Sequence, residues 1–434
     1  MTAAARGLVA TAALMGLAMA VPAVTGWNVR VMSFPPLHAE WEPRVGAGTV
    51  PSIVLAILAA RYAVDVSERL SWRRLLAAVF AAGLAWMLSL ALVDGTRGIG
   101  EILQTPYEYL RTARRVTDVH LLLQEYVSRI PYSSAPKPNW PVHVAGHPPG
   151  ALLFFVGLDR IGLGGGFAAG MVVTVIAATT AVAALVCVKL LGDETMARRA
   201  APFLVFGPAA VWQAVSADAM FAAVAAWALA ALAVAAKRRS VVWSVVGGLL
   251  LGACVMLSYG LLLLGILALT VLVLGRAWFA LPIAAVCALA VVVAFAALGF
   301  SYLDALPALH ERYHDGVGGR RPASYWTWGG LAALAFSAGP LAGAGVAQLL
   351  SRARAYLRDA STRAIAALAA AGAACVAVAD LTGLSKAEVE RIWLPFVPWL
   401  LLGCALLPER WRRRGIALQL AFALAVEHLL RTGW

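Results

Sequence analysis

The chain has 434 residues, of which 62% are hydrophobic and only 13% charged, and its formal net charge is +13. This much apolar surface exceeds what the core of a water-soluble protein of this size can bury, so the composition predicts an integral membrane protein. The basic excess does not require a nucleic-acid partner, because membrane proteins collect Lys and Arg in their cytoplasmic loops.

Apolar runs of about 20 residues recur along the chain, which is the length that a helix needs to cross the hydrocarbon core of a bilayer. No alternating strand pattern accompanies them, so the predicted fold class is an all-α integral membrane protein. Hydropathy predicts about 13 transmembrane helices. They lie at 8–25, 50–66, 75–93, 167–191, 201–214, 218–236, 241–257, 260–275, 277–299, 327–350, 364–380, 392–408 and 416–430. The first of them is either a retained span or a cleaved signal peptide, since Ala18-Met19-Ala20 resembles a cleavage site.

Charged residues are distributed unevenly between the two sides of these spans. With a cytoplasmic N-terminus, more than half of the 35 Lys and Arg residues fall in or beside inner loops, whereas most of the 22 acids and all seven histidines fall outside. The positive-inside rule supports this orientation. Catalytic side chains are drawn mainly from acids and histidine, so the outer face is predicted to be the functional one.

The connection formed by residues 94–166 is far longer than the loops usual between packed helices. Apolar residues of 107–130 fall on one face of a helix, which predicts an amphipathic helix in the outer interface. Residues 151–163 are too short a run to span, so they predict a second interfacial helix, with prolines in its first turn. The chain is thereby divided into a two-span extension (1–74), a core (75–408) and a basic loop with a last span (409–434).

Several short motifs follow one another along this core. Asp94 directly follows a span, His147-Pro148-Pro149 lies in the long loop, Asp218 opens a span within WQAVSADAMF, and Arg391 precedes a span that contains Pro395. In order and sidedness, these motifs resemble the GT-C superfamily of membrane glycosyltransferases. That superfamily includes protein O-mannosyltransferases, bacterial aminoarabinose transferases and actinobacterial arabinofuranosyl- and mannosyltransferases. The chain departs from the pattern in its two additional first spans, in lacking an Asp-Glu or Asp-x-Asp at Asp94, and in having no soluble C-terminal domain.

The resemblance implies an enzyme that transfers a hexosyl or pentosyl group from a polyprenyl-phosphate donor. The acceptor would be a cell-envelope glycan, glycolipid or protein, on the extracytoplasmic face of a bacterial plasma membrane. High Ala, Val and Arg usage favours an actinobacterium as the source. No cofactor is certain, no metal-ligand set is predicted, and a divalent metal (Mg²⁺ or Mn²⁺) stays open. Nucleic acid is not expected as a partner.

Transfer to a hydroxyl group requires a carboxylate to accept the proton and cations to stabilise the departing phosphate. The resemblance implies Asp94 as this general base. It implies His147, Arg391 and Lys386 as contacts of the donor phosphate, and Asp218, Glu390, Asp118 and Tyr259 as substrate-binding residues. Structural alternatives stay open: Asp94 as the end of a span, His147 or Asp218 as a helix cap, and Arg391 as an interfacial anchor paired with Glu388 or Glu390.

Two other functions compete with the glycosyltransferase hypothesis. A lipid or solute transporter would place polar or Gly/Pro-broken helices near the bilayer midplane, and the sequence shows little of this. A non-catalytic scaffold of an envelope-building complex would tolerate the loss of Asp94 and His147.

Overall fold

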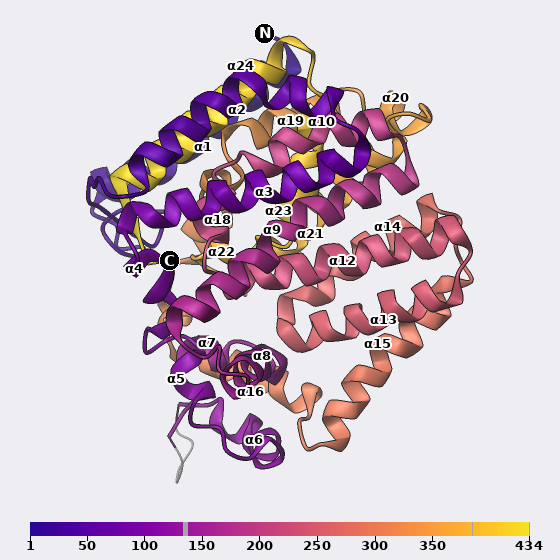
Figure 1. Cartoon of the computed structure of the whole chain (residues 1–434). Helices are drawn as coiled ribbons and strands as arrows, with labels where there is room; N and C mark the ends of the chain where they lie inside the picture. Colours follow the sequence, from indigo (N-terminus) through magenta and orange to yellow (C-terminus); the bar gives the residue numbers. More distant parts are fainter. Residues whose placement is uncertain (133–137, 384, 434) are drawn as a thin grey trace.

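The structure is a computed structural model that describes the whole chain except residues 133–137, 384 and 434. It is an all-α bundle with one two-stranded sheet (Figure 1). The longer helices are α1 (Ala3–Thr25), α2 (Thr49–Arg69), α3 (Trp72–Ala91), α8 (Pro149–Arg160), α9 (Gly166–Leu191), α10 (Glu194–Val205), α12 (Ala217–Arg238), α13 (Val241–Leu257), α14 (Leu264–Leu274), α15 (Ala280–Ala297), α16 (Tyr302–Asp315), α18 (Ala323–Ala338), α19 (Pro340–Ser351), α21 (Arg363–Leu381) and α24 (Arg410–Leu429).

Short helices and 3-10 turns connect them. They are η1 (Leu92–Asp94), α4 (Arg97–Gly100), η2 (Ile102–Gln104), α5 (Leu110–Ala113), α6 (Val119–Glu125), η3 (Val127–Arg129), α7 (Val142–Ala145), α11 (Ala209–Gln213), η4 (Tyr259–Leu263), α17 (Val317–Arg320), α20 (Ala353–Arg358), α22 (Val389–Ile392), α23 (Val397–Leu401) and η5 (Leu402–Leu406). The strands β1 (Ala39–Trp41) and β2 (Leu430–Thr432) pair antiparallel, so that the first long loop meets the end of the chain.

Seven helices of the described residues are long and apolar enough to cross a membrane: α1, α2, α3 with its extension to Asp94, α9, α12, α15 and α21. An eighth span is obtained if α18 and α19 are counted together. The all-α membrane fold is therefore confirmed, but the number of about 13 spans expected from hydropathy is not. The predicted range 416–430 lies in α24, an unbroken helix of 20 residues that begins with several arginines. The remaining predicted ranges form shorter helices or helices interrupted by breaks, which a hydropathy average does not detect.

The most pronounced break separates α18 from α19, whose axes differ by 106°. It falls at Gly339, with a φ of 82°, and Pro340 follows as the first residue of the next helix. The fully buried Gln419 of α24 pairs with backbone groups that the break leaves without a helical partner. Its side-chain amide donates to the Ala338 carbonyl (2.9 Å) and accepts from the Leu341 N–H (3.1 Å). Hydropathy alone does not predict this break, because a partner from a distant helix stabilises it.

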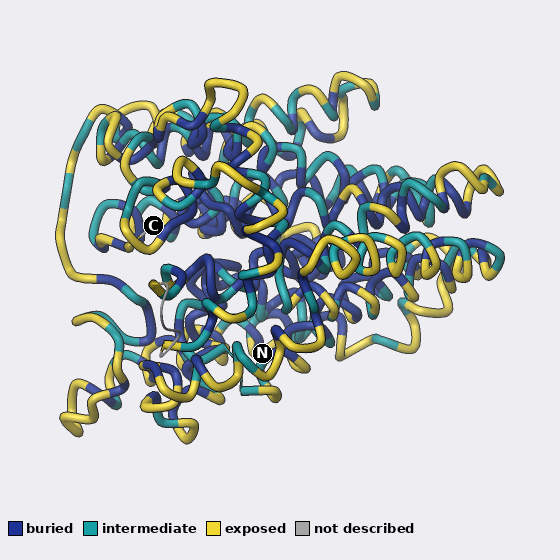
Figure 2. The backbone as a smooth tube through the Cα atoms, turned by 90° about the horizontal axis from the view of Figure 1, so that it is seen from below, coloured by how far each residue is buried: buried dark blue, intermediate teal, exposed yellow. Residues whose placement is uncertain are grey.

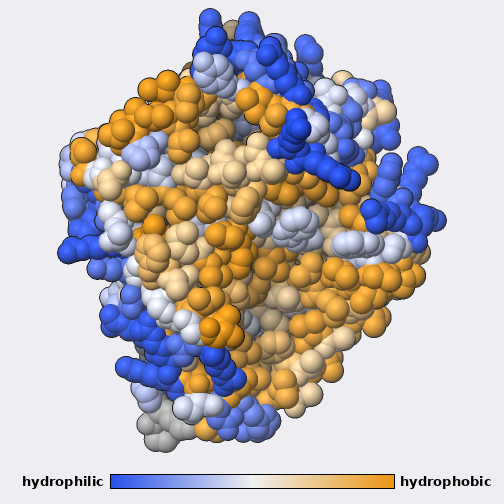
Figure 3. Space-filling model, viewed as in Figure 1, coloured by the Kyte–Doolittle hydropathy of each residue, from blue (hydrophilic) through white to orange (hydrophobic). Residues whose placement is uncertain are grey.

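The helix α12 lies at the centre of the bundle, and 83% of the residues in its most apolar 18-residue stretch are buried. The helix α15 lies at the periphery, and only 11% of its residues are buried. Figure 2 shows the same gradient, with buried residues gathered in the middle of the molecule. The alanine-rich surface of α12 lets α9 and α13 approach it closely. Figure 3 shows an apolar band between two hydrophilic ends. We call them the long-loop end, which contains residues 94–166, and the basic end, which contains Arg198, Arg412 and Arg413.

The long loop does not contain the single amphipathic helix predicted for residues 107–130. That prediction is wrong: the segment forms the short helices α5 and α6 and the turn η3, because Asp118 begins a new helix by accepting hydrogen bonds from the N–H groups of His120 and Leu121. The second predicted helix is confirmed as α8, with Pro149 in its first turn. Arg312 of α16 clamps the loop by donating to the carbonyls of Ile130 and Trp140.

Candidate functional site

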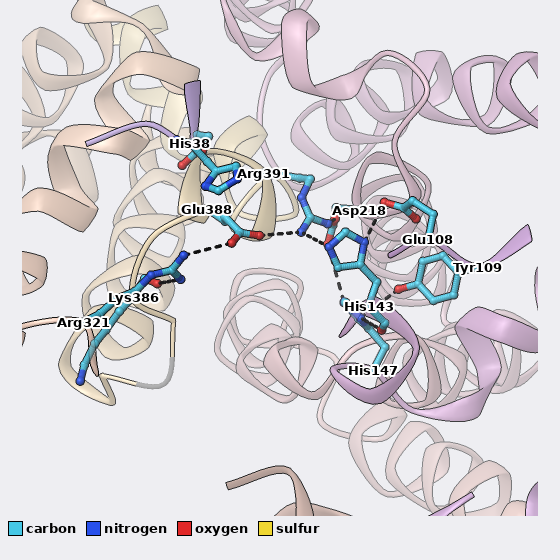
Figure 4. A network of polar contacts seen from close by, with 11 residues as sticks. His38, Glu108, Tyr109, His143, His147, Asp218, Arg321, Lys386, Glu388 and Arg391 are labelled. Atoms are coloured by element: carbon cyan, nitrogen blue, oxygen red, sulfur yellow. Dashed lines mark hydrogen bonds and ion pairs between the residues drawn. The ribbon is translucent and has the colours of Figure 1, made fainter. Parts of the chain in front are cut away.

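Three residues that the sequence motifs single out meet at the long-loop end (Figure 4). The Nη1 of Arg391 forms an ion pair with the Oδ2 of Asp218, and the Nε2 of His147 lies 3.9 Å from the Oδ1 of Asp218. All three side chains are buried, with exposed fractions of 5% for Arg391, 3% for Asp218 and 11% for His147. Residues separated by up to 244 positions in the chain therefore form one polar cluster.

Local structure sets the direction of each side chain. Asp218 lies in the first turn of α12, where the helix dipole favours a negative charge. Arg391 belongs to the short helix α22, which contacts α12. His147 occupies the turn between α7 and α8, ahead of two prolines that begin α8. Each site residue thus lies at a helix end rather than within a span.

A second histidine, which the sequence motifs did not indicate, joins the cluster. The Nδ1 of His143 lies 2.8 Å from the Oε1 of Glu108, and its Nε2 lies 3.5 Å from the Nη2 of Arg391. Because a guanidinium can only donate, the Nε2 of His143 accepts and its Nδ1 carries the proton toward Glu108. Burial alone would raise the pKa of the Glu108 carboxyl, but His143 and Arg391 outweigh that effect and lower the pKa.

His147 is held by two contacts of its Nδ1, which lies 2.8 Å from the His143 carbonyl and 2.9 Å from the Tyr109 hydroxyl. The carbonyl can only accept, so Nδ1 carries the proton and the unprotonated Nε2 faces Asp218. Burial lowers the pKa of His147, which favours this neutral form. The contact between His147 and Asp218 becomes an ion pair only when a second proton is bound.

Glu388 extends the cluster toward α17. One of its carboxylate oxygens lies 3.5 Å from Arg391 and the other lies 3.3 Å from Arg321. Burial would raise the pKa of Glu388, but these two arginines overcome it and lower the pKa to about 2. Lys386 is tied in through its backbone, because Arg321 donates to its carbonyl (2.5 Å). Ala387, which lies between Lys386 and Glu388 in the chain, has a positive φ, as does Glu388.

Glu390 lies at the edge of the cluster and is 1% exposed. One of its carboxylate oxygens accepts from the backbone N–H of His38 at 3.5 Å. Burial raises the pKa of Glu390 to about 7. His38 comes from the long loop before α2, so this loop also lines the cluster.

Asp94, the predicted general base, belongs to a different group of charges. It ends the η1 turn after α3, its side chain is 41% exposed, and its Oδ1 lies 2.6 Å from the Nε of Arg44. Arg44 also contacts Glu427 of α24 at 2.9 Å. Within the described ranges, no direct contact joins Asp94 to Asp218. The loop before α2 nevertheless reaches both groups, through Arg44 and His38.

Two further predicted residues lie outside the cluster. Asp118 caps α6, which is a structural role. Tyr259 packs against Tyr302 with ring centroids 5.3 Å apart. Tyr126, whose hydroxyl donates to the carbonyls of Val144 and His147, lies between Tyr259 and the cluster.

The residues that sequence analysis missed are Glu108, Tyr109, His143, Arg321 and Arg44. His143 has a local signal, because it lies one helical turn before His147 in the same segment. The others have none, since each meets its partner across a long sequence separation. No cluster of three or more His, Cys, Asp or Glu side chains suited to a metal ion occurs among residues 1–132, 138–383 and 385–433.

Comparisons with known proteins give little information on the function of the chain. No family model and no curated protein matches the chain. Among solved structures, the chain is similar to the oligosaccharyltransferase of Archaeoglobus fulgidus in complex with Zn and sulfate, with 14% identity and a TM-score of 0.45. The similarity covers 79% of this chain and 53% of that protein, so the chain spans about half of its length. A likeness this weak identifies neither the family nor the activity of the chain.

Proposed function

We propose that the chain is a GT-C-type membrane glycosyltransferase that uses a polyprenyl-phosphate sugar as donor. The acceptor would be a cell-envelope glycan, glycolipid or protein on the outer side of a bacterial plasma membrane. One observation carries the proposal: His147 and Arg391 both contact Asp218 in a buried cluster, although the three residues come from separate sequence motifs.

The energetics of the cluster support a functional role. Burying an ion costs several kcal/mol, and a paired partner often only offsets this cost. Ionisable groups within or beside the membrane are therefore retained mainly for function. The cluster combines basic, acidic and imidazole groups, which form a set able to bind a charged headgroup and to move protons. Its members are Arg321, Arg391, Glu108, Asp218, Glu388, His143 and His147.

In the proposed reaction, the acceptor hydroxyl attacks the anomeric carbon of the donor sugar. The bond from that carbon to the phosphate oxygen breaks, and its electron pair leaves with the phosphate. Asp94 takes the hydroxyl proton, since its side chain is 41% exposed, unlike those of Asp218 and Glu390, and Arg44 contacts one of its oxygens. The departing phosphate is stabilised by Arg391, His147 and Lys386.

Arg391 must change partners to do this, because its guanidinium already contacts Asp218 and Glu388. A phosphate oxygen would replace one of the two carboxylates. Asp218 and Glu390 then remain to bind polar groups of the substrate. Substrate contacts of Asp118 and Tyr259 stay predictions without support from their surroundings.

The test is transfer of radiolabelled sugar from polyprenyl-phosphate donors to membrane acceptors, measured for variants at equal expression. Asp94→Asn keeps the shape of the side chain and removes the base, so we expect a loss of roughly 10²-fold. Asp304→Asn alters an exposed carboxylate of the outer segment 301–325 and should leave transfer unchanged. If Asp94→Asn remains fully active, the base is another residue; without any transfer by the wild type, the proposed function is wrong.

A lipid or solute transporter is the second candidate, and the 106° break between α18 and α19 favours it. Reconstitution into liposomes separates the two hypotheses. A transporter moves labelled lipid or solute across the bilayer without forming a glycosidic bond, whereas a glycosyltransferase forms a product that can be hydrolysed to the labelled sugar. A scaffold would do neither.

A further inference from the structure

The side chain of Arg44 is the meeting point of three distant parts of the chain. Its Nε lies 2.6 Å from the Oδ1 of Asp94, its Nη2 lies 2.9 Å from the Oε1 of Glu427, and its Nη1 donates to the Leu430 carbonyl at 2.6 Å. Hydrogen bonds to Leu430 and Glu427 fix Nη1 and Nη2, whereas the contact of Nε with Asp94 is an ion pair without hydrogen-bond geometry. The Arg44 side chain is only 13% exposed, which is uncommon for an arginine outside a span.

The end of the chain fixes this arginine from behind. The backbone N–H of Arg44 donates to the His428 carbonyl (2.8 Å), and that of Glu42 donates to the Leu429 carbonyl (3.0 Å). The pairing of β1 with β2 continues this ladder. Glu427 is 6% exposed and lies on α24, so its carboxylate is a rigid anchor for one edge of the guanidinium.

Asp94 lies where the 3-10 extension of α3 ends. It ends a single 3-10 turn, and Gly95, with a φ of 67°, then directs the chain away from α3. Only one oxygen of its carboxylate faces Arg44, and the side chain is 41% exposed, so the carboxylate remains accessible from solvent. A general base must be held within hydrogen-bond reach of the proton that it removes.

We propose that Arg44 is a positioning residue for Asp94, and that Glu427 and the C-terminal strand hold Arg44 in place. The inference rests on the proposed function, because it assigns Arg44 a role through the proposed base. It gives Glu427 and the Leu430 carbonyl a role at the site, because they fix the guanidinium that orients the Asp94 carboxylate.

The same two segments provide a matched control. Arg431 pairs with Glu42 at 3.2 Å, and this ion pair also joins β2 to the loop before α2, but both side chains are well exposed and neither contacts Asp94. Arg431→Met therefore removes an arginine from the same strand pair without touching the proposed base. If strand pairing alone matters, Arg431→Met and Arg44→Met have the same effect on transfer.

The experiment is a double-mutant cycle on sugar transfer, with Arg44→Met made in the wild type and in Asp94→Asn. We expect Arg44→Met to lower kcat by roughly 10- to 100-fold with little change in the KM for the donor, because the base is misplaced rather than the donor site. In the Asp94→Asn background the further loss should be less than about twofold, since there is no base left to position. Arg44→Lys keeps one contact and should fall between the two.

Because Arg44→Met leaves Glu427 buried without its cation, the pair Arg44→Met/Glu427→Gln removes both charges and serves as the folding control. Equal losses in the two backgrounds, or an equal loss for Arg431→Met, would overturn the positioning role while leaving the glycosyltransferase in place. Absence of transfer by the wild type would overturn both. The two failures are therefore distinguishable.

Discussion

Most ion pairs at the two ends of the bundle differ in exposure, and the buried Arg412, which is 4% exposed, is the exception at the basic end. At the basic end, Lys189 and Arg198 pair with Glu194 at 2.5 Å, and Arg413 pairs with Asp65 at 2.5 Å, with side chains that are 15–49% exposed. At the long-loop end, the pair of Arg391 and Asp218 is 5% and 3% exposed. Both ends contain partners one helical turn apart and partners from distant segments, so the exposure of these pairs, and not their sequence separation, differs between the ends.

This difference separates charges that orient a membrane protein from charges that form a site. Exposed ion pairs contribute only about 0–1 kcal/mol each, so those of the basic end do little for stability beyond completing a positive surface. A buried network loses far more hydration, and removal of one member leaves the others without compensation. The comparison therefore predicts large effects at one end and small effects at the other.

The largest effect is expected for Arg391→Met. It leaves Asp218 and Glu388 buried without their shared guanidinium, so we expect a loss of about 3–5 kcal/mol in the free energy of unfolding. The apparent melting temperature in detergent should fall accordingly. The double variant Arg391→Met/Asp218→Asn removes a charge of each sign and should recover part of the loss. A single variant as stable as the wild type would remove the contrast between the two ends.

A smaller effect concerns the pH dependence of stability through Glu390. Burial raises the pKa of Glu390 from 4.5 to about 7, so the folded protein binds this proton more tightly than the unfolded chain. The contribution is fully present below about pH 4.5 and is lost as the pH rises through about 7, with a size on the order of 3 kcal/mol. Between pH 5 and pH 8 the free energy of unfolding of the wild type should fall through Glu390, and Glu390→Gln should lack this fall. The measurement is the melting temperature as a function of pH. The exposed Glu101 is the control, and Glu101→Gln should keep the wild-type slope.

The smallest effect is expected for Arg413→Met at the basic end. Its ion pair with Asp65 is half exposed, so the free energy of unfolding should change by less than about 1 kcal/mol. Raising the salt concentration should reduce even this difference, because exposed pairs are screened. A loss comparable to that of Arg391→Met would show that burial does not distinguish the two ends.

Local patterns determined the all-α membrane class and the positions of α1, α2, α3, α9, α12, α15 and α21. This succeeds because length and hydropathy are properties of one segment, and the bilayer requires each spanning segment to satisfy its own backbone. The order of the motifs also singled out His147, Asp218 and Arg391, which lie in three separate segments.

Other features depend on partners far away in the chain. The break at Gly339 exists because Gln419 satisfies its backbone, and the predicted helix over 107–130 fails because Asp118 begins a new one while Arg312 holds the loop. Neither partner can be assigned from hydropathy.

By itself, the sequence determined that the chain is a helical membrane protein and where most of its helices lie, and its resemblance proposed eight site residues, among them His147, Asp218 and Arg391. Only the tertiary structure decided that these three meet, that Glu108, His143 and Arg321 join them, and that Asp94 pairs instead with Arg44 and Glu427. The physical reason is range. Helix formation in a membrane follows from neighbouring residues, whereas a buried charge is compensated by whichever segment the fold brings beside it.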